Sequence, residues 1–127
     1  LKNFADAWQD VRRRVAGLAP IGYTRIGPAL RHAGFALGNE AARRRWVILV
    51  TDARPNDYDY YEGRYGIEDV RQAVRELDRS GIHLHTLAIG NADKPSIPAM
   101  MQGASYRMLP EATRLADALA DFFRRAA

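Results

Sequence analysis

Apolar residues recur along this chain with two spacings, which predict helices and strands in alternation. Steps of three and four predict amphipathic helices over residues 4–18, 24–38 and 67–80 and from about residue 111 onward. Apolar runs predict strands at 46–51, 82–89 and 105–109, and residues 96–102 have the length of a short helix. This order is typical of an α/β fold with a mostly parallel sheet.

The run from Trp46 to Val50 is apolar throughout and ends at Thr51 and Asp52. Such a run is typical of a strand buried on both faces of a parallel sheet. Ligands of open α/β sheets bind outside the carboxyl ends of the strands, so we expect chemistry at Asp52. The stretch that follows, residues 53–66, predicts a long, acidic and tyrosine-rich loop, and loops of this length usually have a function.

Three strands are few for a sheet of this kind, and two predicted helices precede the first strand. The chain begins at Leu1 with residues that already belong to a helical pattern, for which Asn3 is the predicted N-cap. We therefore expect residues 1–127 to be one partial domain of a longer protein. Its missing N-terminal part would supply further strands.

The composition narrows the classes of function. The chain has no cysteine, which excludes a disulfide framework and a thiolate metal site and favours the cytoplasm. No apolar run approaches the roughly 18 residues of a membrane span. The net charge of +4 comes from arginines in separate clusters without a base-reading motif, so we expect no nucleic-acid partner, although a basic nucleic-acid-binding module stays an alternative.

Oxygen-bearing side chains gather around the predicted end of the first strand. Thr24 starts a predicted helix, Asp52 ends the strand, and Asp57, Asp59 and Glu62 follow in the loop. Hydroxyl and carboxylate oxygens are the ligands that Mg²⁺ prefers. The residues alone leave open that Thr24 is an ordinary helix cap and that Asp52 braces a loop.

Two segments carry a family resemblance. Residues 22–33, GYTRIGPALRHA, and residues 50–69, VTDARPNDYDYYEGRYGIED, are similar to the C-terminal von Willebrand factor A domain of the NorD/CbbO proteins. The resemblance implies a Rossmann-like fold with a metal-ion-dependent adhesion site for Mg²⁺ or Mn²⁺. Thr24 matches its second motif and Asp52 its third. The first motif, Asp-x-Ser-x-Ser, is absent from these 127 residues, and Ala53 stands where the family tends to have glycine.

The resemblance also implies a function. Such domains are protein-binding adaptors, not enzymes, and work with a MoxR-type AAA+ ATPase on a client such as Rubisco or nitric oxide reductase. ATP hydrolysis belongs to the ATPase partner. The residues expected to shape the partner-binding rim are Asp57, Tyr58, Asp59, Tyr60, Tyr61, Arg64 and Tyr65. Self-packing of the tyrosines within their loop is an equally open interpretation.

Other residues suggest weaker alternatives. An enzyme would be a Mg²⁺-dependent phosphoryl-transfer or hydrolase domain that uses Asp52 and Asp57. No serine stands at a recognised motif spacing from a histidine. His83 and His85 share one face of a predicted strand, but without a third ligand, packing or a helix-facing hydrogen bond is the stronger interpretation.

Overall fold

The computed structural model describes residues 5–19, 22–52, 61, 63–90 and 96–126. They form an α/β structure whose elements follow in the predicted order. The elements are α1 (Trp8–Ala16), α2 (Ile26–Gly38), β1 (Arg45–Thr51), α3 (Gly63–Arg79), β2 (Ile82–Ile89), α4 (Ser96–Met100), β3 (Ser105–Leu109), the 3₁₀ helix η1 (Ala112–Arg114) and α5 (Leu115–Ala126).

The three strands form one parallel sheet in the order β1-β2-β3. Arg45 lies opposite Ile82 at the start of the β1–β2 pair. In the second pair, His85 lies opposite Ser105 and Ile89 opposite Leu109. The predicted parallel α/β sheet is confirmed.

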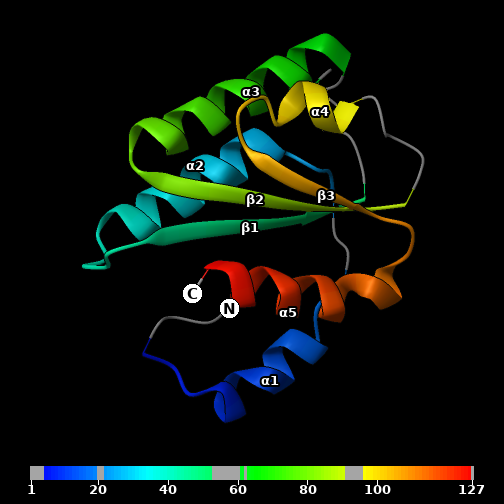
Figure 1. Ribbon diagram of the computed structural model, residues 1–127. Coiled ribbons are helices and arrows are strands. Elements are labelled where there is room, and N and C mark those ends of the chain that lie inside the picture. Colours follow the sequence, from blue (N-terminus) through cyan, green and yellow to red (C-terminus); the bar gives the residue numbers. More distant parts are fainter. Residues whose placement is uncertain (1–4, 20–21, 53–60, 62, 91–95, 127) are drawn as a thin grey trace.

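Helices cover the two faces of this sheet unequally. Helices α2, α3 and α4 lie on one face, α5 lies on the other, and α1 lies beyond α5 (Figure 1). Successive side chains of a strand point to opposite faces, so each strand contributes alternate residues to each side. We call these two sides the α2–α3 face and the α5 face.

The α2–α3 face contains the larger hydrophobic core of the described residues. Its buried members are Ile26, Leu30, Val47, Val70, Ala73, Val74, Leu77, Ile82, Leu84, Ala88, Ile97, Met100 and Met101. On the α5 face, the described cluster of buried residues consists of Leu87, Leu109 and Ala118, with Ile48, Ile89, Leu115 and Leu119 packed against it.

The prediction that β1 is buried on both faces is wrong. Val47 and Thr51 are buried on the α2–α3 face, but Val50 is 44% exposed. The buried cluster that the structure describes on the α5 face is centred on Leu87, Leu109 and Ala118, which belong to β2, β3 and α5, so Val50 of the edge strand β1 lies outside it.

Helix α1 is shorter and less buried than its pattern predicts. It begins after the N-cap Ala7, and Val11 is its buried residue. Asn3, the predicted N-cap, lies outside the described residues. Trp8 and Leu18 are each 59% exposed. Helix α1 lies beyond α5 in Figure 1, which agrees with the exposure of these side chains. None of the described helices has the length and apolar character needed to cross a membrane.

Candidate functional site

Thr24 and Asp52 lie at the same end of the sheet. Helix α2 ends at Gly38 and β1 begins at Arg45, whose guanidinium donates a hydrogen bond of 3.4 Å to the Gly38 carbonyl oxygen. The 13 residues of α2 span about 20 Å and the 7 residues of β1 about 23 Å. The chain therefore reverses direction between α2 and β1, so α2 begins near the carboxyl ends of the strands (Figure 1).

Thr24 is not the N-cap of α2. The helix begins at Ile26, its N-cap is Arg25, and no side chain caps it. Thr24 instead lies in a β-bridge two residues before the helix and is exposed, as is Asp52 directly after β1. The structure thus leaves both side chains at the surface of the same sheet end.

The described residues around Asp52 enclose little space. Thr51, Asp52, Ala88, Gly90 and Met108 line a recess of about 10 Å³, together with Ile89 and Ile97. This volume is about the size of one water molecule.

The described residues do not by themselves complete a metal site. They contain no group of three or more histidine, cysteine, aspartate or glutamate residues that could hold a metal ion. Asp57, Asp59 and Glu62 lie outside the described residues, as does Ala53. One hydroxyl and one carboxylate fall short of the six oxygen ligands that Mg²⁺ requires, so waters or further donors must supply the rest.

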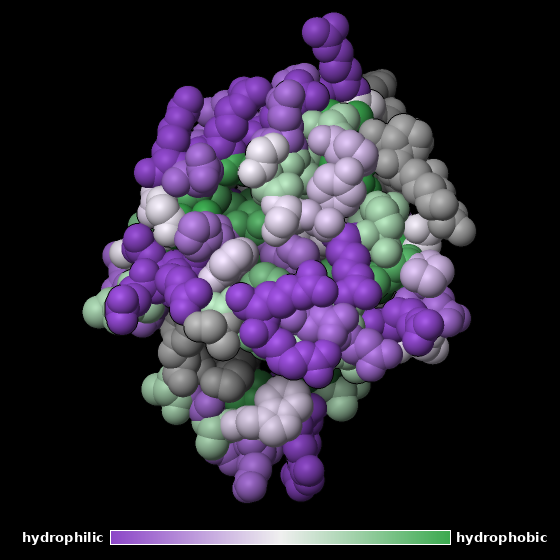
Figure 2. Space-filling view, viewed as in Figure 1, coloured by the Kyte–Doolittle hydropathy of each residue, from purple (hydrophilic) through white to green (hydrophobic). Residues whose placement is uncertain are grey.

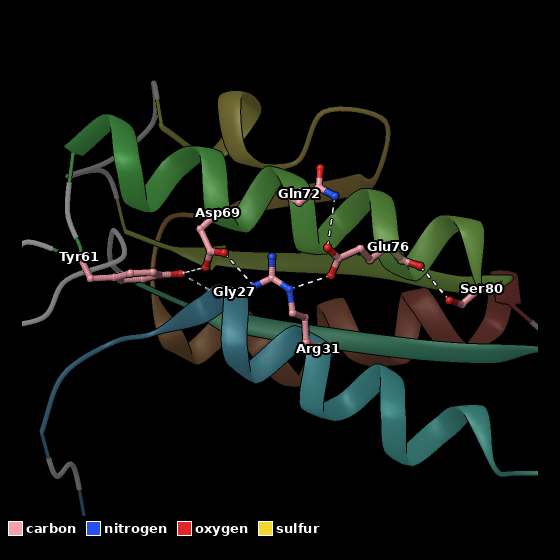
Figure 3. A network of polar contacts seen from close by, with 7 residues as sticks. All are labelled: Gly27, Arg31, Tyr61, Asp69, Gln72, Glu76 and Ser80. Carbon is pink, nitrogen blue, oxygen red and sulfur yellow. Dashed lines mark hydrogen bonds and ion pairs between the residues drawn. The ribbon is translucent and has the colours of Figure 1, made fainter.

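Tyr61 connects the end of the tyrosine-rich segment to both neighbouring helices (Figure 3). Its hydroxyl accepts a hydrogen bond of 3.2 Å from the backbone N–H of Gly27, in the first turn of α2. The same hydroxyl donates to Oδ2 of Asp69 on α3. Burial, followed by the hydrogen bond to Asp69, raises the pKa of Tyr61 above its ordinary value. The phenol therefore stays protonated as a donor.

Arg31 extends this network along α3. Its guanidinium binds Asp69 at 2.8 Å and Glu76 at 2.7 Å, and Gln72 donates to Glu76 at 3.2 Å (Figure 3). Burial lowers the pKa of Arg31, but its hydrogen bonds to the two carboxylates outweigh this effect and raise it. The network joins α2 to α3 through charge-assisted hydrogen bonds, which are stronger than neutral ones.

Gly27 is required by the close approach of these groups. A Cβ atom at this position would lie 1.9 Å from Oδ2 of Asp69 and 2.7 Å from the hydroxyl oxygen of Tyr61. A Cβ atom essentially never lies this close to a nonbonded oxygen, so a side chain here would displace the Tyr61–Asp69 pair. Sequence reasoning missed this network, although Gly27 and Gly34 share one helix face and indicate close packing.

The structure describes three of the seven residues of the predicted partner-binding rim, and these differ in exposure. Tyr61 is 4% exposed, stacks edge to face with Tyr65 at 5.8 Å, and has the Arg25 guanidinium 5.3 Å from its ring centre. Packing within the chain is therefore the correct interpretation for Tyr61, which is not part of an exposed rim. Arg64 and Tyr65 are exposed. The other rim residues, Asp57, Tyr58, Asp59 and Tyr60, lie outside the described residues.

A serine does contact a histidine in the fold, which spacing along the chain did not predict. Nδ1 of His85 lies 2.7 Å from Oγ of Ser105, because β2 and β3 pair these two positions. Oγ also donates to the Leu84 carbonyl oxygen at 3.3 Å, and the imidazole stacks on Phe122 at 4.7 Å. The packing of His85 on α5 agrees with the prediction, whereas its hydrogen bond goes to a serine of the neighbouring strand and not to a helix. The hydroxyl proton of Ser105 is engaged by the backbone.

Comparison with known proteins agrees with the resemblance. The von Willebrand factor type A domain model matches residues 1–125. The chain is 43% identical over 112 residues to Protein NorD of Stutzerimonas stutzeri, which covers 87% of this chain and 18% of that protein. It is 33% identical over 125 residues to Protein NorD of Brucella melitensis. This match covers 98% of this chain and 20% of that protein.

An uncharacterised protein of Pseudomonas aeruginosa is 38% identical over 126 residues, which cover 98% of this chain and 21% of that protein. The chain thus spans about a fifth of the length of these relatives. The sequence match over nearly the whole chain and the parallel α/β sheet agree with each other. This chain belongs to the von Willebrand factor type A domain family.

Proposed function

We propose that this domain is a metal-dependent protein-binding adaptor within a larger NorD-like protein. The observation that carries the proposal is that Thr24, just before α2, and Asp52, just after β1, are both exposed. Helix α2 begins near the carboxyl end of β1 (Figure 1). The Tyr61–Gly27–Asp69 contacts support it, because they hold the first turn of α2 beside this end. Ligands of open α/β sheets bind there.

Thr24 and Asp52 would hold Mg²⁺ or Mn²⁺ through a hydroxyl and a carboxylate oxygen. The ion supplies a positive charge to which a carboxylate of a partner protein can bind. One carboxylate and neutral hydroxyls leave that charge incompletely neutralised, so an acidic ligand is attracted. An upstream Asp-x-Ser-x-Ser strand, expected from the family resemblance, would supply the remaining protein ligands.

The proposed partners are those of the NorD/CbbO resemblance. They are a MoxR-type AAA+ ATPase, which hydrolyses the ATP, and a client such as nitric oxide reductase or Rubisco, in the cytoplasm. The named NorD relatives support this context, since they contain a segment similar to this chain. The enzyme alternative based on Asp52 and Asp57 has less support, because the described recess at Asp52 holds about 10 Å³.

Calorimetric titration with Mg²⁺ and Mn²⁺ tests the proposal. It compares this chain with a version extended upstream to include the expected Asp-x-Ser-x-Ser strand. We expect binding in the extended version, and we expect Asp52→Ala and Thr24→Ala to weaken it by about tenfold or more. Asp78→Ala, which removes an exposed carboxylate of α3, is the matched control and should bind normally.

Two results would contradict the proposal. Binding that survives Asp52→Ala in the extended version would show that the metal lies elsewhere. Tight binding by the short chain alone would indicate a self-sufficient metal centre and would favour the enzyme alternative.

A further inference from the structure

The first turn of α2 obtains a hydrogen-bond acceptor from a residue 34 positions away. The first N–H groups of a helix have no partner within the helix and often bind a side chain at its N-cap. The N-cap residue Arg25 makes no such bond, and Pro28 has no N–H. The N–H of Gly27 instead binds the hydroxyl of Tyr61 in a buried contact. The start of α2 therefore depends on a side chain from a distant part of the sequence.

Tyr61 contacts the start of α2 at two places. Its hydroxyl binds Gly27, and its ring lies beside Arg25, whose guanidinium carbon is 5.3 Å from the ring centre. Thr24 directly precedes Arg25. Three residues of extended chain reach at most about 11 Å, so Thr24 stays close to both contacts. A movement of Tyr61 would therefore shift the threonine that is proposed to bind the metal.

Asp69 of α3 holds Tyr61 and α2 together. Its Oδ2 accepts the hydrogen bond from the Tyr61 hydroxyl, and its Oδ1 binds Arg31 at 2.8 Å. Gly27 and Arg31 are four residues apart and so lie on the same side of α2. One carboxylate thus restrains two successive turns of the helix (Figure 3). This arrangement limits both the rotation of α2 and its sliding along α3.

The Tyr61–Asp69 contact is sheltered in comparison with most polar groups of the chain. Hydrophilic side chains cover much of the face seen in Figure 2. Charged residues of α3 such as Arg75 and Asp78 are exposed. In contrast, the side chain of Asp69 is 20% exposed and Tyr61 is 4% exposed. Hydrogen bonds strengthen one another when they are shielded from water, so this contact can hold a fixed geometry.

We propose that Tyr61 and Asp69 are positioning residues for the proposed metal site, because they fix the place of Thr24. This inference rests on the proposed function, since it requires an ion bound by Thr24 and Asp52. Mg²⁺ requires a nearly ideal octahedron of ligands at about 2.0–2.1 Å, so a small shift of one ligand weakens binding. Residues that orient metal ligands contribute about 10-fold to 100-fold to metal affinity, and the more indirect contribution of Tyr61 should be about fivefold to tenfold.

Metal binding and the Tyr61 contact should strengthen each other. If the contact raises the affinity of the site, an ion at the site stabilises the contact by the same factor. Hydrogen exchange at the N–H of Gly27 reports this, because exchange is slowed while its bond to Tyr61 is intact. We expect Mg²⁺ to slow exchange at Gly27 in the version extended upstream, and Asp52→Ala to remove this effect.

Calorimetric titration of the extended version with Mg²⁺ and Mn²⁺ tests the inference. Tyr61→Phe should weaken binding about fivefold to tenfold. Tyr106→Phe removes a hydroxyl from an exposed tyrosine of β3 and should bind normally. Leu37→Ala truncates a partly buried side chain in the last turn of α2 and controls for a general loss of stability. Its metal affinity should stay close to that of the native version.

Asp69→Asn provides a second measurement that does not depend on the folding of Tyr61→Phe. The amide has the size of the carboxylate and still accepts a hydrogen bond, but it lacks the charge that binds Arg31. Charge-assisted hydrogen bonds are the stronger ones, so metal affinity should fall about threefold. Amide exchange measured by NMR should be faster at Gly27 in both variants than in the native version.

Three results would overturn the inference. They are native metal affinity in a folded Tyr61→Phe version, an equal loss of affinity in Leu37→Ala, and exchange at Gly27 that Mg²⁺ does not change. Each would show that the contact is only structural, while weaker binding in Asp52→Ala would show that the proposed function still stands. A native extended version that binds no metal would overturn the proposed function and this inference together.

Discussion

The two faces of the sheet are built from alternate residues of the same strands and differ in what they hold. In β2, Leu84 and Ala88 are buried on the α2–α3 face, whereas His83 and His85 stand on the α5 face. The first face is filled by apolar side chains, and the amino-terminal half of the second carries imidazoles, Ser105 and arginines. The same short strand therefore contributes to an apolar core on one side and to a more polar region on the other.

The two faces of the sheet also differ in how closely their side chains and helices pack. On the α2–α3 face, a Cβ atom at Gly34 would lie 2.6 Å from Cδ2 of Leu77, so the two helices approach closely. On the α5 face, a groove of about 490 Å³ remains beside the helix. We infer that the α2–α3 face provides most of the stability and holds the beginning of α2 in place.

Truncating one leucine on each face gives the largest expected effect. Leu30 of α2 is 2% exposed in the larger cluster, so Leu30→Ala should lower the free energy of unfolding by about 3 kcal/mol. Leu115 of α5 is only partly buried, and Leu115→Ala should cost about 1 kcal/mol. Urea unfolding measures both. Equal losses would show that the two faces contribute equally.

A methyl group at Gly27 should have the next largest effect. Gly27→Ala forces Asp69 and Tyr61 apart, and overpacking of this kind costs about 1–3 kcal/mol. Gly38→Ala is the matched control in the same helix, because a Cβ atom there has no neighbour within 4 Å. Thermal unfolding compares them. A Gly27→Ala variant as stable as the Gly38→Ala variant would show that the Tyr61–Asp69 pair does not restrict this position.

Periodicity predicted most of the architecture because it records which positions are buried. The strands β1 and β2 and the helix α2 lie close to their predicted residues. The pattern of α1 is correct for a helix, but periodicity does not state which layer a helix occupies, and α1 lies outside α5 (Figure 1). The helix α3 begins at Gly63 and not at Ile67, since the two glycines and the tyrosine of residues 63–66 gave no helical signal there.

The contacts that organise the site could not be predicted from periodicity. Gly27 and Tyr61 are 34 positions apart, and their hydrogen bond exists only after α2 and α3 have packed. The His85–Ser105 contact depends on the register of β2 and β3, which five residues of β3 do not reveal. Asp52 and Thr24 were singled out by the end of a strand pattern and the start of a helix pattern, and the family motif then suggested a metal-binding role, which stays a prediction. Long-range polar pairs carry no such local pattern.

The smallest expected effect on stability comes from removing the Tyr61 hydroxyl from the network. Tyr61→Phe deprives the Gly27 N–H and Asp69 of their partner and should cost about 1–2 kcal/mol at neutral pH. The pKa of Tyr61 is raised above its ordinary value of 10.0, so above about pH 10 the unfolded chain loses this proton while the folded chain keeps it.

The stability contributed by this tyrosine is therefore complete below pH 10 and declines as the pH rises further. Urea unfolding between pH 9 and pH 11 should show this decline in the native chain and a smaller one in Tyr61→Phe. Tyr65→Phe, which alters an exposed ring packed against Tyr61, should keep the native decline. An identical pH dependence in Tyr61→Phe and the native chain would mean that the hydroxyl is not held by Asp69. The α2–α3 face would then owe its rigidity to apolar packing and to the Arg31 ion pairs alone.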